Sequence, residues 1–388
     1  MTDAPAVDAT ARPPTDAPRG GYAAAIRLDH LTKRYPGATR PAVDDLDLEV
    51  PEGELVALVG PSGCGKTTTL KMINRLVEPT AGTVWLGGID IRTMPVHRLR
   101  RGIGYVIQQA GLFPHRKVRE NIATVPQLLG WKKARIHERV DELAELLDLD
   151  PDLLGRYPAA LSGGQQQRVG VARALAADPP VLLMDEPYSA VDPIVRARLQ
   201  DELIDLQRRV KKTIVLVTHD IDEAIKLADR IAILRVGGVL EQYGPPEELL
   251  RAPATPFVAD FLGDDRGIKR LSLMRVGQAA LSEGPVMAPA GATDEARRVM
   301  AEHGTDWVAV VDDGRLQGWV GADALDGQRS LAGIDPVPFA AVVRPDTTLK
   351  AALDTIVTSR TRVAVVLDGD QRYQGMLTLD DLAEGITS

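Results

Sequence analysis

The residues with the most definite chemistry in this sequence lie between Gly60 and Thr67 and match the pattern G-x-x-x-x-G-K-[ST]. Glycines in such a loop let backbone N–H groups curl around phosphates, and the helix that follows adds the positive end of its dipole. We expect Lys66 to reach the β and γ phosphates of a nucleotide and Thr67 to ligate Mg²⁺. Cys64 occupies a variable position of the pattern and is expected to fill space.

Two more polar groups follow short apolar runs. Asp185 and Glu186 come after the run 181–184, and His219 comes two residues after the run 213–217. Buried parallel strands present ligands at their carboxyl ends, so these groups should meet at one edge of a sheet. Asp185 is then the expected Mg²⁺ partner, and Glu186 is the candidate for polarising an attacking water. A histidine after a strand is often structural, but its convergence with the other groups favours a functional role.

A further phosphate-facing element is Leu161-Ser-Gly-Gly-Gln165, before an expected helix from Gln166 to Ala177. Ser162 is a good N-cap, and the glycines leave backbone donors exposed at the start of a helix. One chain therefore carries two phosphate-facing helix ends.

The elements that position these residues alternate between strand and helix from Ile26 to about Leu262. The run 54–59 reads as a strand that leads into the glycine loop, and residues 66–76 have helical character. The runs 181–184 and 213–217 are short and β-branched enough to be buried parallel strands. The fold class is α/β, and 388 residues are enough for two folded units.

Composition excludes several classes of protein. A net charge of −8 and a pI near 5.4 argue against a nucleic-acid binder, although a local basic patch is compatible with them. The single cysteine, Cys64, rules out a disulfide within the chain, and the six histidines lack metal-ligand spacing. No apolar run approaches the roughly 18 residues of a membrane span, and no signal peptide is recognisable. We expect a cytoplasmic location and a disordered tail over residues 1–21.

The order of these motifs resembles that of the ATP-binding cassette (ABC) family over about residues 26 to 262. The resemblance also covers Gln108 and the segment 189–192. It implies a RecA-like core with a helical subdomain, and a head-to-tail homodimer in which Ser162 and Gly164 of one copy contact the γ-phosphate held by the other copy. It assigns Gln108 to Mg²⁺ and the attacking water, His219 to the γ-phosphate, and Tyr35 to stacking on adenine, with plain packing as the alternative for Tyr35.

The expected catalytic residues are thus Glu186, His219 and Gln108, with Thr67, Gln108 and Asp185 as ligands of Mg²⁺. The expected ATP-binding residues are Tyr35, Gly60, Pro61, Ser62, Gly63, Cys64, Gly65, Lys66, Thr67, Thr68, Ser162, Gly163, Gly164, Gln165 and Asp192.

Closer similarity is visible in the segments 72–79, 104–109, 111–115 and 120–122. These resemble ATPase subunits of importers for quaternary-amine osmoprotectants such as glycine betaine, proline, choline or carnitine. The resemblance implies a separate integral-membrane permease, an extracellular substrate-binding protein, and attachment to the cytoplasmic face of the membrane through the permease. Residues 113–122 would dock the permease, and an ordinary surface loop is the alternative.

After Leu262 a charged connector leads to a repeat with a shift of 55 residues, which pairs Val308 with Val363 and Asp313 with Asp368. Each repeat reads as helix, strand, Asp-Gly hairpin turn, strand and helix start. The repeats resemble a tandem pair of CBS domains, which bind adenine nucleotides in related proteins. Thr378 and Asp381 match the ribose-binding Thr-x-x-Asp, whereas the first repeat has Gly321 and Ala324 in those places.

The expected division is a tail (1–21), a cassette (22–263), a linker (264–280) and a regulatory CBS pair (281–388). Three roles remain open for the pair: binding an adenine nucleotide or cyclic di-AMP, sensing ionic strength, or rigid dimerisation without a ligand. Alternatives for the whole chain are an importer ATPase for another solute, a soluble mechanochemical ABC ATPase, or a regulatory nucleotide binder. The mechanochemical type carries a coiled-coil insertion or two cassettes, and neither is visible, while a regulatory binder would be expected to lose Glu186 or Lys66.

Overall fold

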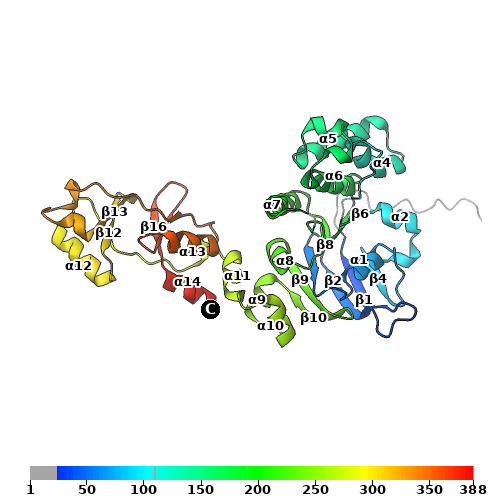
Figure 1. Cartoon of the computed structure of the whole chain (residues 1–388), viewed down its shortest axis with the longest axis horizontal. Helices are drawn as coiled ribbons and strands as arrows, with labels where there is room; N and C mark the ends of the chain where they lie inside the picture. The colour runs from blue at the N-terminus through cyan, green and yellow to red at the C-terminus, as the bar shows by residue number, and fades with distance from the viewer. Residues whose placement is uncertain (1–23, 109–110, 190, 388) are drawn as a thin grey trace, which may run out of the picture. The chain divides into compact units, whose positions relative to one another are not determined.

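The structure is a computed structural model that describes residues 24–108, 111–189 and 191–387. The expected disordered tail therefore lies outside the described residues. The chain divides into two compact units between Leu249 and Leu250 (Figure 1). Among the described helices, none is both long and apolar enough to cross a membrane.

A six-stranded sheet forms the centre of the first unit, in the order β10-β9-β3-β8-β7-β6. Neighbouring strands pair in parallel except β10, which runs antiparallel to β9. The strands are β3 (Leu55–Val59), β6 (Ile103–Val106), β7 (Val181–Asp185), β8 (Thr213–Val217), β9 (Arg230–Arg235) and β10 (Val239–Gly244). Every residue of β3 and β8 is buried, as expected of central parallel strands covered on both faces. The α/β prediction and the strands at 181–184 and 213–217 are confirmed.

A second, antiparallel sheet has the order β2-β1-β4-β5. Its strands are β1 (Ile26–Lys33), β2 (Val43–Val50), β4 (Ala81–Leu86) and β5 (Ile89–Asp90). Strand β2 alternates buried and exposed residues, which is typical of a sheet with one face on a core. Its buried side chains share one core with β3 and with helix α1 (Lys66–Ile73), so the two sheets support the glycine loop between them.

Helices α3 (Val118–Ile122), α4 (Thr124–Leu128), α5 (Lys133–Leu146) and α6 (Gly163–Leu175) form a subdomain, called the helical subdomain below. Figure 1 shows α4, α5 and α6 together at one end of the first unit. Side chains of α3, α5 and α6 share a core with β7 and with α7 (Pro193–Val210). The remaining helical segments of this unit are η1 (Ile91–Thr93), α2 (Val96–Arg101), η2 (Pro151–Gly155), η3 (Pro158–Ala160), α8 (Ile221–Leu227) and α9 (Pro246–Arg251), which contains the division between units.

Two helix boundaries differ from the sequence prediction. Helix α1 ends at Ile73 rather than Leu76, because the chain turns into the left-handed region at Arg75 (φ 48°). Helix α6 begins at Gly163 rather than Gln166, because the Ser162 side chain caps it at once. The earlier start places the exposed glycine backbone inside the first helical turn.

The second unit contains two sheets of identical topology, β11-β12-β13 and β14-β15-β16. In each, the first pair is parallel and the second antiparallel. The elements are α10 (Pro256–Leu262), α11 (Arg266–Leu273), η4 (Val276–Gln278), β11 (Val286–Met287), α12 (Thr293–His303), β12 (Trp307–Asp312), β13 (Arg315–Gly321), η5 (Ala322–Leu325), η6 (Leu331–Gly333), β14 (Val342–Val343), α13 (Leu349–Thr358), β15 (Ala364–Leu367), β16 (Tyr373–Leu377) and α14 (Leu379–Thr387). The repeat seen in the sequence is thus a structural repeat.

The two hairpin turns of the repeats are not alike. Asp313 (φ 47°) and Gly314 (φ 77°) form a two-residue turn, as the Asp-Gly pair predicts. The second turn is longer, because the Asp368 carboxylate accepts hydrogen bonds from the backbone N–H groups of Asp370 and Arg372. The repeat offset therefore grows from 55 residues before the turns to 57 after them, where Gly318 matches Gly375. A hairpin was correctly predicted twice, but the second Asp-Gly pair does not form a two-residue turn.

The segment 264–280, expected to be a linker, is folded. It contains α11 and η4, and Leu271 and Val276 are completely buried. They share a core with side chains of α13, β15 and α14. Of its charged residues, Arg270 is itself buried and the Lys269 side chain is only 13% exposed, so the segment is an integral part of the second unit.

Candidate functional site

The glycine loop between β3 and α1 needs glycine for two separate reasons. Gly60, Gly63 and Gly65 have positive φ angles of 147°, 78° and 101°, which side chains disfavour. A Cβ at Gly60 would lie 2.1 Å from the Leu234 carbonyl oxygen, and one at Gly65 would lie 2.3 Å from that of Ala42. Neighbouring backbone therefore packs so closely against the loop that Gly60 and Gly65 have no room for a side chain.

Lys66 lies folded into this loop. It is 6% exposed, and its Nζ donates to the carbonyl oxygens of Gly60 at 2.6 Å and Pro61 at 3.1 Å. Cys64 is fully buried, with its sulfur 3.6 Å from the same Nζ. The loop borders an open pocket of about 660 Å³ lined by Ala42, Ser62, Gly63, Gly65, Lys66, Thr67, Thr68 and Glu186. This pocket offers backbone donors and one ammonium group to an anionic ligand.

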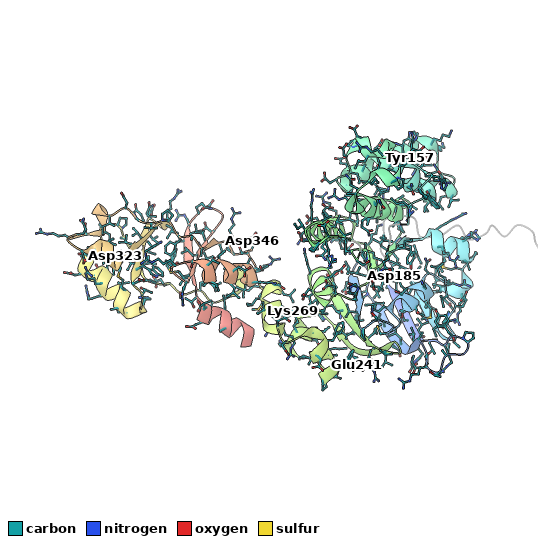
Figure 2. The ribbon with its side chains drawn as sticks, in the orientation of Figure 1. Tyr157, Asp185, Glu241, Lys269, Asp323 and Asp346 are labelled. Carbon is teal, nitrogen blue, oxygen red and sulfur yellow. The ribbon has the colours of Figure 1, made fainter. Side chains whose placement is uncertain are left out.

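Asp185 lies at the carboxyl end of β7, at the centre of the first unit (Figure 2). Its Oδ1 accepts a hydrogen bond of 2.9 Å from Thr67 Oγ1. Burial raises the pKa of the Asp185 carboxyl, against the opposing effects of the Thr67 hydrogen bond and the charges of Lys71 and Lys66. A partly desolvated carboxylate beside a hydroxyl is a set of hard oxygen donors, which fits Mg²⁺. The residues present therefore suit the expected ion.

Gln108 and His219, the other two expected catalytic residues, both lie beside the Glu186 carboxylate. Its Oε2 accepts a hydrogen bond of 3.3 Å from Gln108 Nε2 and lies 3.3 Å from His219 Nδ1. Glu186 also has a positive φ of 45°, held by its N–H donating to the Val217 carbonyl. Such backbone strain in a residue other than glycine costs about 1–3 kcal/mol and is concentrated at functional sites. The sheet order brings three segments together at this carboxylate.

The segment Ser162 to Gln165 lies at the start of α6. Ser162 Oγ accepts from the Gln165 N–H at 3.3 Å, and the Ser162 N–H donates to Gln165 Oε1 at 2.9 Å, forming a capping box. Ser162 and Gly163 are exposed. None of these residues lines the pocket at Lys66. Within one chain, the two phosphate-facing helix ends therefore do not form one site.

Asp192 and Tyr35 lie in simpler surroundings. Asp192 caps α7, with Oδ1 accepting from the Val195 N–H at 3.0 Å. Tyr35 is 40% exposed, and Lys33 Nζ lies 5.2 Å from the centre of its ring. The Asp192 side chain is therefore engaged in capping α7, while the Tyr35 ring is accessible to a planar ligand.

Thr378 and Asp381 lie together at the start of α14. Asp381 Oδ2 accepts from Thr378 N at 2.8 Å and from Thr378 Oγ1 at 2.7 Å, and the Asp381 N–H donates to Thr378 Oγ1 at 3.2 Å. One carboxylate oxygen is therefore committed to a capping box. This local role was not anticipated from the Thr-x-x-Asp pattern.

Glu223 lies near Glu186 and His219 and was not predicted from the sequence. It lies in the first turn of α8, four positions after His219, and is only 7% exposed. The only sequence signal was an acidic residue at a helix start, which is normally a solvated position.

The nucleotide loop, the acid pair at a parallel strand end and the separate capped glycine segment define a P-loop ATPase of the ATP-binding cassette class. Comparison with known proteins agrees. The family model described as "ABC transporter" matches residues 43–189, and the model described as "CBS domain" matches residues 334–388, the second repeat.

The chain is 46% identical to the osmoprotectant import ATP-binding protein OsmV of Salmonella typhimurium, over 94% of this chain and 96% of that protein. It is 45% identical to the carnitine transport ATP-binding protein OpuCA of Listeria monocytogenes, over 92% and 91%. A dimeric post-hydrolysis structure of the ATP-binding cassette MJ0796 with ADP and Pi is 34% identical. The match covers 57% of this chain and 98% of the MJ0796 chain, with a TM-score of 0.51. The chain therefore belongs to the family of ABC importer ATPases with a C-terminal CBS domain, and it binds and hydrolyses ATP.

Proposed function

We propose that this chain energises the uptake of a quaternary-amine osmoprotectant, such as glycine betaine, proline, choline or carnitine, through a separate permease. The observation that carries the proposal is the extent of the likeness to OsmV and OpuCA, which continues through the second unit. A cassette alone is shared by transporters of many solutes, whereas this pairing of units is shared with proteins named for osmoprotectant and carnitine import. In this proposal the chain lies at the cytoplasmic face of the membrane, held there by the permease.

The test of this proposal is solute uptake by cells that lack the gene. Uptake of labelled glycine betaine, proline, choline and carnitine is measured at high osmolarity, with the wild-type chain and the Glu186→Gln variant supplied separately. We expect the wild-type chain alone to restore uptake of at least one of the four. If uptake of all four is unchanged by the deletion, the osmoprotectant assignment is wrong.

For the hydrolytic site we propose the following roles. Lys66 leaves its carbonyl contacts with Gly60 and Pro61 to bind the β and γ phosphates, and Thr67, Asp185 and Gln108 hold Mg²⁺. The ion would supply positive charge that neutralises the negative charge developing on the phosphate. Glu186 accepts a hydrogen bond from the attacking water and polarises it, and His219 binds the γ-phosphate. The contacts of Glu186 with Gln108 and His219 support this assignment.

We propose that two copies pair head to tail, so that each P-loop is completed by Ser162 to Gln165 of the other copy. Two observations support the pairing. The capped start of α6 is exposed and lies outside the pocket at Lys66. The similar cassette structure is dimeric by its description.

The permease is proposed to dock on the segment from Phe113 to Ile122. Asn121 is completely buried, and its amide bonds to backbone groups of Phe113, Arg116 and Lys117. The loop is therefore held in one shape while Phe113 remains 40% exposed. A fixed loop with an exposed aromatic side chain suits protein recognition better than it suits a solvated connection.

Phe113→Asp is expected to abolish co-purification with the permease after mild detergent extraction. Loss of a central aromatic contact costs about 2 kcal/mol or more, on the order of 30-fold in Kd. ATP hydrolysis by the isolated chain should stay within about twofold, because Phe113 does not line the nucleotide pocket. The matched control is Tyr157→Asp, since Tyr157 is 49% exposed on the same subdomain (Figure 2) but lies outside the loop. Equal retention of the permease by both variants would place the docking surface elsewhere.

In the second unit, we propose that an adenosine-type ligand is bound by the second repeat, with Asp381 Oδ1 accepting from its ribose. A charged hydrogen bond contributes about 1.5–3 kcal/mol, so Asp381→Ala should weaken binding roughly 10- to 150-fold. The measurement is calorimetric titration of the full chain with AMP and with cyclic di-AMP. Because Asp381 also caps α14, the unfolding temperature is measured in parallel, and Ala324→Ser in the first repeat serves as the control. If neither ligand binds the wild-type chain, the proposed adenosine-type ligand site is wrong.

A further inference from the structure

A second, smaller pocket lies beside the proposed catalytic carboxylate. The empty space there, open solvent included, is about 270 Å³, and it is lined by Glu186, Tyr188, Ser189, Arg196, Thr218, His219, Asp220 and Glu223. The proposed roles of Glu186 and His219 account for two of these side chains. Arg196 on α7 and Glu223 on α8 also line this pocket and have no role in that mechanism.

Glu223 is bound to the segment that carries His219. Its Oε2 accepts a hydrogen bond of 2.7 Å from Thr218 Oγ1, and Thr218 Oγ1 in turn accepts from the Asp220 N–H at 3.1 Å. These two bonds fix the residues on both sides of His219. The side chain of His219 is 59% exposed, so its placement depends on its neighbours in the chain.

Two buried polar atoms at this pocket lack protein partners. Among the described residues, Glu223 Oε1 and Arg196 Nε are buried without a hydrogen bond. Arg196 is otherwise held, since its Nη2 donates to the Val191 carbonyl at 3.1 Å and its Nη1 lies 3.9 Å from Asp220 Oδ2. A buried acceptor and a buried donor beside one polar pocket are normally satisfied by ordered water.

We propose that Glu223 is a positioning residue for ATP hydrolysis, which holds His219 next to Glu186 through Thr218 and, together with Arg196, binds ordered water in this pocket. The inference rests on the roles proposed above for Glu186 and His219. It explains why an acidic side chain at a helix start turns inward rather than into solvent.

The charges around Glu223 make its protonation relevant to the site. Burial raises the pKa of the Glu223 carboxyl to about 7; the Thr218 hydrogen bond and the charges of Arg196 and His219 oppose the rise, and Asp220 adds to it. Tyr188 and Glu186 face the same pocket from the segment after β7. Glu223 therefore exchanges a proton near neutral pH.

The test uses the full-length chain and measures kcat and KM for MgATP between pH 6 and 9. Glu223→Ala and Thr218→Val are each expected to lower kcat about tenfold with KM changed less than twofold, because neither residue lines the phosphate pocket. Thr218→Ser retains the hydroxyl and should restore kcat to within about twofold. Glu223→Gln keeps an oxygen for the Thr218 hydroxyl, so its kcat at the plateau should be near normal. The wild-type chain is expected to show an inflection near pH 7 in its pH profile, and the Glu223→Gln variant is expected to lose it.

Asp222→Asn is the matched control, since it makes the same kind of change on the exposed side of the same helical turn and should leave kcat and the pH profile unaltered. Unfolding temperature and ATP affinity are measured for every variant. Unchanged kcat in both Glu223→Ala and Thr218→Val overturns the proposal, as does a loss of kcat that Thr218→Ser fails to restore. An unaltered inflection near pH 7 in the Glu223→Gln variant would show that protonation of Glu223 does not affect turnover. Wild-type and Glu186→Gln chains assayed alongside show separately whether the hydrolytic site is assigned correctly.

Discussion

Glu186→Gln is expected to lower the turnover of ATP by about 10²- to 10⁴-fold, which is the usual contribution of general-base assistance. Gln has the same size and can remain in contact with Gln108 and His219, but its amide is a far weaker base than a carboxylate. ATP affinity should stay within a few-fold, because the phosphate contacts belong to Lys66 and the loop backbone. Phosphate release at saturating MgATP measures the first quantity, and equilibrium binding of ATP measures the second.

The matched control is Glu52→Gln. Glu52 is exposed in the turn before β3, at the amino ends of the strands, so the same charge change is made at the opposite edge of the sheet. It should leave turnover unaffected. Near-normal hydrolysis by the Glu186→Gln chain would show that another group activates the water.

Ser162→Arg is expected to abolish hydrolysis at the P-loop of the partner copy rather than at the P-loop of its own chain. The substitution removes the capping hydroxyl and places a long cation at the exposed start of α6, where the proposed dimer requires close contact with phosphate. Loss of two charge-assisted hydrogen bonds, at about 1.5–3 kcal/mol each, corresponds to roughly 10²- to 10⁴-fold in rate. ATP binding to the isolated chain should change little, because Ser162 does not line the pocket at Lys66.

Mixing Ser162→Arg with Glu186→Gln chains tests whether the sites are shared. In a mixed dimer, one composite site combines the intact P-loop and Glu186 of the first chain with the intact Ser162 of the second, while the other site carries both changes. Only one site per dimer can then close on ATP. Mixed dimers that trap two ATP molecules would contradict the shared-site model. Ser162→Ala removes the cap without adding bulk and is the control for loss of the cap alone.

The sequence by itself determined the parts of this protein whose chemistry is local. The loop from Gly60 to Gly65 could be recognised because positive φ angles and close backbone approach admit only glycine at several of its positions. The strands β3, β7 and β8 could be placed because strands buried on both faces must be short continuous apolar runs. The cap at Ser162 and the repeat in the second unit follow from patterns a few residues long.

Other features depended on which segments the fold brings together. Glu186 and Gln108 are 78 positions apart and meet only because β6 and β7 are neighbours in the sheet. The residues at 264–280 look like a charged connector in sequence, yet Leu271 is completely buried against helices that come much later in the chain. Burial of this kind is a property of the packed unit, so composition within the segment could not predict it.

Glu223 shows the same limit at the site itself. In sequence it is one acid among three near the start of a helix, where exposure is the ordinary outcome. Only the packing of α8 against β3 and α7 turns it inward, binds it to Thr218 and raises its pKa. The sequence determined which groups can carry out phosphate chemistry, because residue type and local backbone decide that. The tertiary structure decided which side chains are desolvated beside them, because desolvation depends on every element that packs around the site.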